Sequence, residues 1–123
     1  MEPYLIMKTA SVVLGVAALG GLVMFIMTLR GGHPPAWLAM LHGFLAAAGI
    51  TLLAYSFFSV RLPKLAAWSL LFFVIAAAGG AFLNLAYHLR NRPLPKEFMT
   101  AHAALALVGL ALLHYVAWSS PEG

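Results

Sequence analysis

The chain contains no cysteine and few charges, with only 8% of its 123 residues charged and only three of them acidic. Without thiols the protein can form no disulfide, no iron–sulfur cluster, no thiolate-bound metal site and no covalently attached c-type haem. The net charge of +4 is spread over the ends of apolar segments and forms no single basic patch. Nucleic acid is therefore not an expected partner.

Apolar residues make up 63% of the sequence, which is too high for a soluble domain of this length and predicts an integral membrane protein. Charged residues bound four long uncharged stretches, each able to cross a hydrocarbon core of about 30 Å as a helix. We predict spans near residues 3–29, 35–59, 63–89 and 95–118. Pro35, Pro63 and Pro95 mark helix starts, where proline loses no hydrogen bond. The predicted fold is an all-α, up-down four-helix membrane bundle, forming one transmembrane domain over residues 1–123.

The sequence also matches itself when it is shifted by sixty residues without gaps. Sixteen of sixty aligned positions are identical, against roughly six expected by chance for this composition. The pattern predicts a tandem duplicated helical hairpin, with halves 1–60 and 61–120. Because each half holds an even number of spans, the halves should be related by a pseudo-two-fold axis along the membrane normal.

Two histidines, His42 and His102, occupy equivalent positions in this repeat, each seven residues after the proline that starts its helix. Seven residues correspond to roughly 10 Å of helix, so both histidines should share one depth in the membrane. A histidine in hydrocarbon is costly, and two that face one axis indicate a shared ligand. We therefore predict that His42 and His102 are metal ligands, binding a single bis-histidine haem b.

Other interpretations of the histidine pair remain open. Each ring could simply form a hydrogen bond to a neighbouring helix, at Thr51, Thr100 or a backbone carbonyl. Zinc or copper fits less well than haem, because no carboxylate or thiol lies at the same depth to complete a four-coordinate site.

Small residues accompany the histidines on the same helix faces and at a similar depth. Gly49 and Gly109 lie two turns from His42 and His102, while Gly20 and Gly80 reach that depth on the first and third helices. These four glycines are predicted to line a slot in which a flat macrocycle approaches the backbone. The alternative is ordinary small-residue packing between membrane helices.

The matched arginines Arg30 and Arg90 follow the first and third spans. They are predicted to bind haem propionates by charge-assisted hydrogen bonds, or else to act as ordinary topology determinants. The excess of basic residues at these two turns, which also includes Arg92 and Lys96, places the turns in the cytoplasm and both termini in the periplasm.

The remaining histidines break the repeat. We expect His33 and His88 to be solvated at the interface rather than ligating, with a quinone site or a proton entry as alternatives. His114 has no counterpart on the second helix, so a second haem is not expected. An outer aromatic belt is expected from Tyr55, Tyr115, Trp68 and Trp118.

In architecture the chain resembles the small four-helix b-type membrane cytochromes, which include cytochrome b561-like proteins and the cytochrome b subunits of membrane oxidoreductases. The resemblance is carried by His42, His102 and their flanking small residues, and it implies haem b and electron transfer. One departure is the absence of a second histidine pair, which argues against electron transfer across the whole membrane by one chain. The stretch 87–95, together with Ala101-His102-Ala103, is also similar to uncharacterised bacterial membrane proteins, which implies no function. A bacterial inner membrane is the expected location.

The function expected from these features is electron transfer between one haem b and a quinone or partner subunit, whether or not the chain is itself an enzyme component. Membrane lipid is the expected environment, and homo-oligomerisation is left open. The alternative is a non-catalytic structural or assembly subunit of a membrane complex. A small multidrug exporter would fit the length, but Glu2, Glu97 and Glu122 all lie at span ends and leave no buried carboxylate for proton coupling.

Overall fold

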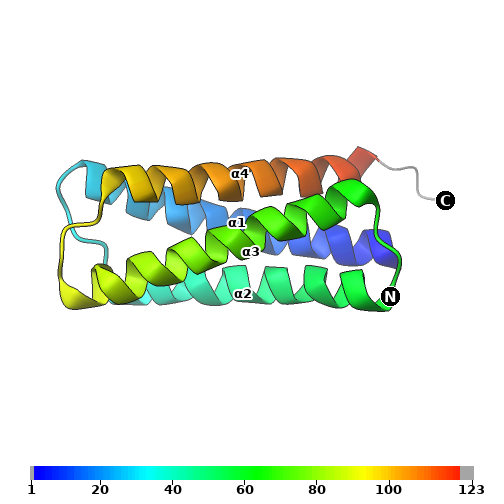
Figure 1. The fold of residues 1–123 in the computed structure, drawn as a ribbon, viewed down its shortest axis with the longest axis horizontal. Helices are drawn as coiled ribbons and strands as arrows, with labels where there is room; N and C mark the ends of the chain where they lie inside the picture. The colour runs from blue at the N-terminus through cyan, green and yellow to red at the C-terminus, as the bar shows by residue number, and fades with distance from the viewer. Residues whose placement is uncertain (1, 120–123) are drawn as a thin grey trace.

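A computed structural model of the chain describes residues 2–119, which form four long helices arranged up and down along one axis (Figure 1). The helices are α1 (Pro3–Leu29), α2 (Ala36–Ser59), α3 (Lys64–Ala86) and α4 (Lys96–Ser119), with a 3₁₀ turn η1 (His88–Arg90) between α3 and α4. They cover the predicted helical ranges except near residue 87, where the third helix ends early and its last residues form η1 instead.

Each helix packs on two neighbours and lies diagonally opposite the remaining one. α1 packs on α2 and α4, and α3 packs on α4 and α2, so α2 and α4 face each other across the bundle (Figure 1). The start of α1 and the end of α4 lie at one end of the bundle, while the α1–α2 and α3–α4 turns lie at the other. The diagonal placement brings the faces of α2 and α4 that carry His42 and His102 toward each other.

The turns after α1 and η1 are built alike. Gly31 adopts a left-handed conformation (φ 81°), and the amides of Gly31 and Gly32 donate to the carbonyls of Thr28 and Met27, which is the Schellman arrangement that ends a helix. Sixty residues later Asn91 takes the left-handed position (φ 51°). There the Asn91 and Arg92 amides donate to the carbonyls of His88 and Tyr87.

The two hairpins do not correspond residue by residue at the offset of sixty that the sequence predicts. On α1 and α3 the buried residues correspond at an offset of 59: Met7 with Ala66, Ala10 with Ser69, Leu14 with Phe73, and Ala17 with Ala76. On α2 and α4 the offset is 60: Gly49 with Gly109, Leu53 with Leu113, and Ser56 with Val116. The extra residue of the second hairpin is taken up at Tyr87 (φ −122°, ψ −61°), where α3 ends and η1 begins.

The core of the bundle lies toward the end that holds the start of α1. It is formed by Met7, Ala10, Leu14, Leu53, Ala66, Phe73, Leu113, Val116 and Ala117. Large apolar side chains also cover the outside, including Phe58, which is 83% exposed, and Phe44, which is 68% exposed. All four helices are long and apolar enough to cross a membrane. An apolar exterior of this kind suits contact with lipid.

Candidate functional site

The imidazole rings of His42 and His102 meet across the diagonal of the bundle. Their ring centres lie 6.2 Å apart, and the ring planes are inclined by 79°. Both side chains are only partly buried. Since α2 and α4 are not neighbours, these two rings bridge the space between the hairpins at this level.

Each of these histidines is held by the other helix of its own hairpin. His42 Nδ1–H donates to the Ala17 carbonyl on α1, and His102 Nδ1–H donates to the Ala76 carbonyl on α3, both at 2.7 Å. Because a carbonyl oxygen can only accept a hydrogen bond, the Nδ1 atom that faces it must carry a proton. In the neutral ring this leaves a lone pair on Nε2. Within residues 2–119 neither Nε2 atom takes part in a hydrogen bond.

Among the acceptors considered from sequence, the structure selects the backbone carbonyl over the threonine hydroxyls. Thr51 and Thr100 each donate within their own helix, to the carbonyls of Ala47 and Lys96.

Glycines make close contact with both imidazoles. A Cβ atom built on Gly21 would lie 2.9 Å from His42 Cε1, and one built on Gly80 would lie 2.8 Å from His102 Cε1. Gly20 and Gly79 are less restricted, since their Cβ atoms would lie 3.9 Å and 4.0 Å from the same histidines. The pair predicted from sequence was Gly20 with Gly80; the structural pair is Gly21 with Gly80, which follows from the offset of 59 between α1 and α3.

Gly49 and Gly109 lie in the contacts between neighbouring helices. A Cβ on Gly49 would come within 2.5 Å of Leu14 Cγ on α1, and one on Gly109 would come within 3.3 Å of Phe72, Phe73 and the Ser69 carbonyl on α3. The role visible for these two glycines is close helix packing inside each hairpin.

Arg30 and Arg90 lie at the bundle end that carries the α1–α2 and α3–α4 turns. Arg30 caps α1, Arg90 ends η1, and both are exposed. His42 lies six residues into α2 from Ala36, or about 9 Å along the axis. The structure therefore brings the two histidines together but leaves the arginines at the surface, at the nearer end of the bundle.

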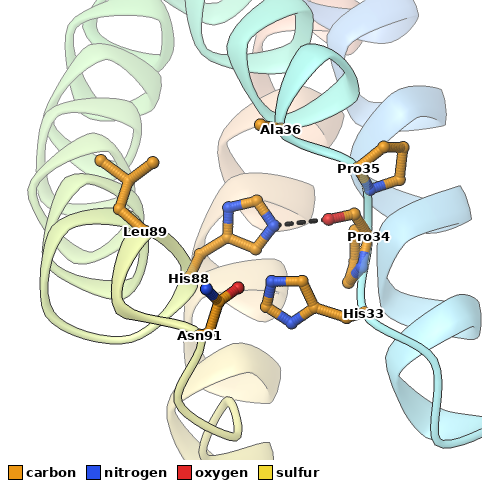
Figure 2. Close-up of a pocket in the computed structure, with 7 residues that line it drawn as sticks. All are labelled: His33, Pro34, Pro35, Ala36, His88, Leu89 and Asn91. Carbon is orange, nitrogen blue, oxygen red and sulfur yellow. Dashed lines mark hydrogen bonds between the residues drawn. The ribbon is translucent and has the colours of Figure 1, made fainter.

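His88 is not solvated as the sequence suggested; its side chain is only 7% exposed. Its Nε2–H donates to the Pro34 carbonyl at 2.6 Å (Figure 2). Its Nδ1 lies 3.2 Å from the Asn84 side-chain oxygen. His33, which is exposed, stacks on it with ring centres 4.6 Å apart and planes inclined by 14°. The four-residue spacing of Asn84 and His88 is the sequence signal for their mutual contact, since such a pair would share one face of a continuous helix.

A pocket of about 240 Å³ adjoins this cluster. It is lined by His33, Pro34, Pro35, Ala36, His88, Leu89 and Asn91, which come from the turn before α2 and from η1 (Figure 2).

At the opposite end, Trp118 joins α4 to α1. Its Nε1–H donates to Ser11 Oγ at 3.1 Å, and the Lys8 ammonium lies 5.2 Å from its ring centre. Exposed side chains at this end fit the predicted belt: Tyr55, Tyr115 and Trp68. His114 is exposed and stacks obliquely on Trp118, 5.7 Å away.

The described part of the chain, residues 2–119, contains no cluster of three or more His, Cys, Asp or Glu side chains able to hold a metal ion. The fold and the site thus define an all-helical bundle of four apolar helices with one inward-facing pair of imidazole donors. No protein-family model, curated protein or solved structure matches this chain.

Proposed function

We propose that this protein is a b-type membrane cytochrome of a bacterial inner membrane, in which His42 and His102 bind one haem that exchanges electrons with a quinone or a partner subunit. The proposal includes insertion of all four helices in the membrane and an origin by duplication of a helical hairpin. The similar buried faces and turns of the two hairpins support the duplication.

The observation that carries the proposal is the separation of the two rings. Two imidazoles that together held one iron, each through a nitrogen–metal bond of about 2 Å, would have their ring centres about 6 Å apart. The ring centres of His42 and His102 lie 6.2 Å apart.

The donor set also fits haem better than a bare ion. Two imidazoles leave a zinc or copper(II) ion short of ligands, and no further carboxylate or histidine joins them among residues 2–119. A porphyrin brings its own four nitrogens and asks the protein only for the axial pair. When bound, it would supply one-electron redox chemistry.

The remaining residues would act on the ligands. The Ala17 and Ala76 carbonyls accept hydrogen bonds from the Nδ1 protons, so they fix the tautomer and the orientation of each ring. Gly21 and Gly80 allow α1 and α3 to approach the imidazoles. Arg30 and Arg90, at the nearer end of the bundle, are the proposed propionate partners.

The test is the visible spectrum of the protein purified in detergent from cells that make haem. We expect a six-coordinate low-spin b-type spectrum that is lost in His42→Ala and in His102→Ala. The matched control is His114→Ala, which removes an exposed histidine of the same helix α4 and should keep the spectrum. Wild-type haem content in both single variants, or a colourless wild-type protein from haem-replete cells, would overturn the proposal.

The second candidate is a structural or assembly subunit of a membrane complex. It is favoured by the hydrogen bonds from His42 to Ala17 and from His102 to Ala76, which already give each imidazole a role inside its own hairpin. A colourless protein that copurifies with a stable partner complex would favour this function.

A further inference from the structure

We propose that the pocket between the α1–α2 turn and η1 binds the head group of a quinone, a flat ring with two oxygen substituents and an apolar tail. The choice of a quinone over other small rings rests on the proposed function, whereas the binding itself does not require haem. The proposal locates the redox partner at one set of residues, which the histidine pair alone does not do.

The wall of the pocket combines apolar and polar groups. Pro35, Ala36 and Leu89 supply apolar contacts, while His33 and Asn91 supply polar groups (Figure 2). Within residues 2–119 the side chains of His33 and Asn91 make no hydrogen bond, so both can serve a ring oxygen. A mostly apolar wall with a few converging polar groups is the usual form of a small-molecule site.

The pocket already holds two stacked planar rings, those of His33 and His88. His33 lies parallel to His88 at 4.6 Å between ring centres. His88 is fixed from both sides by Pro34 and Asn84, so its ring is a rigid platform, whereas the His33 side chain is exposed and free to reorient. A quinone ring can pack against the same group of rings.

Size and charge limit the occupants of the pocket. Its volume of about 240 Å³ is below the range of about 300–1,000 Å³ that is usual for small-molecule pockets, so it holds at most the ring of a ligand and leaves the tail outside. A phosphate or anionic lipid head group would require Arg or Lys in the wall, and none of the seven lining residues is Arg or Lys.

The position also fits the proposed electron transfer. The pocket includes Ala36, the first residue of α2, which lies about 9 Å along the helix from His42. Leu89, which lines the pocket, is itself 57% exposed, so an apolar tail can leave the pocket over an apolar surface.

Tryptophan fluorescence tests the proposal without relying on haem. Trp37 adjoins the pocket in sequence, whereas Trp68 lies near the start of α3 and Trp118 near the end of α4, both at the opposite end of the bundle. A chain with Trp37 alone (Trp68→Phe with Trp118→Phe) is titrated in detergent with decylubiquinone, against a matched chain with Trp68 alone (Trp37→Phe with Trp118→Phe). We expect saturable quenching of Trp37 and only weak, linear quenching of Trp68.

Variants of the wall complete the test. His33→Ala and Asn91→Gly, the latter chosen to keep the left-handed backbone, should each raise the half-saturating concentration about tenfold, and His114→Ala should leave it unchanged. Linear quenching that is equal at Trp37 and Trp68, or saturable quenching that neither wall variant weakens, would overturn the proposal. So would displacement of the probe by phosphatidylglycerol micelles but not by a second quinone, since it would indicate a lipid head-group site.

The same titration in the His42→Ala, His102→Ala double variant separates this proposal from the haem proposal. Because neither histidine lines the pocket, we expect Trp37 in this variant to show the same saturable quenching. Saturable binding to a colourless wild-type protein would support the pocket and contradict the cytochrome. A coloured protein whose Trp37 shows no saturable quenching would contradict only the pocket.

Discussion

At the scale of single residues, the hydrogen bonds of His42 and His102 determine what these side chains can do. Their Nδ1 protons are held by backbone carbonyls at 2.7 Å, on helices that cannot easily move away. The Nε2 atom of each ring therefore carries the lone pair that remains available to bind a ligand. The position of each imidazole depends in turn on the absence of a side chain at Gly21 and Gly80.

We predict that Gly21→Ala and Gly80→Ala will each displace a histidine. The new Cβ atom would lie within 2.9 Å of a Cε1 atom, so the ring must shift or lose its carbonyl. The expected cost is about 1–3 kcal/mol in the free energy of unfolding, measured by denaturation in detergent, together with reduced haem content. Gly20→Ala and Gly79→Ala are the controls, because their Cβ atoms meet the histidines at ordinary contact distances. Equal effects in both pairs would contradict this role.

A second residue-scale prediction concerns His88. His88→Phe keeps a ring for stacking but leaves the buried Pro34 carbonyl without its donor, at a cost of about 1–3 kcal/mol. His33→Phe, which keeps the stack and removes no hydrogen bond between residues 2–119, should cost less than about 0.5 kcal/mol. Thermal unfolding in detergent compares the two variants. A His33→Phe variant as unstable as His88→Phe would contradict the proposed role of the Pro34 contact.

At the scale of the helices, sequence could predict the elements but not their register. Prolines, charge positions and apolar length gave four helices with starts close to those observed. The gapless match at sixty nevertheless paired Gly20 with Gly80, because the adjacent alanines and glycines on α1 and α3 find identical partners at both offsets. Only the break at Tyr87, which depends on how η1 docks on Pro34, decides between the two offsets.

The sequence could predict that His42 and His102 form a pair, but it could not predict that His88 is buried. The pair follows from helical spacing and from the repeat. The burial of His88 depends on a contact with Pro34, fifty-four residues away, which no local pattern encodes.

Packing within one hairpin gives a prediction at this scale. Gly49→Ala should destabilise the protein by about 1–3 kcal/mol, because its Cβ would overlap Leu14 on α1. In a Leu14→Ala background the same change should cost almost nothing, so a double-mutant cycle should show coupling above about 1 kcal/mol. Gly43→Ala, with open space around its Cβ, is the control and should behave alike in both backgrounds. Additive effects at residues 14 and 49 would contradict this packing.

At the scale of the whole molecule, the bundle has two chemically different ends. One end carries Arg30, Arg90, Arg92 and Lys96 with the stacked histidines and the pocket, and the other carries Lys8, Arg61 and Lys64 with Trp118 and further aromatic side chains. Basic turns favour the cytoplasmic side of a membrane, so the pocket should open there.

The absence of cysteine makes this orientation testable. Pro93→Cys labels the α3–α4 turn and Ser59→Cys labels the α2–α3 turn, both at exposed positions. A membrane-impermeant maleimide added to intact spheroplasts should react with the cysteine at position 59 and spare the one at 93. Both should react after the membrane is opened. Labelling of position 93 alone in intact spheroplasts would reverse the assigned orientation.

We propose that one haem is held by His42 and His102 across the α2–α4 diagonal, and electron paramagnetic resonance of the oxidised, purified protein is the decisive measurement. If His42 and His102 hold the haem, the protein should give a low-spin ferric signal that accounts for one iron per chain. Replacing either His42 or His102 should remove that signal, while the His114→Ala protein should retain it. A high-spin ferric signal in the wild-type protein, or no ferric signal from a haem-replete preparation, would contradict the account.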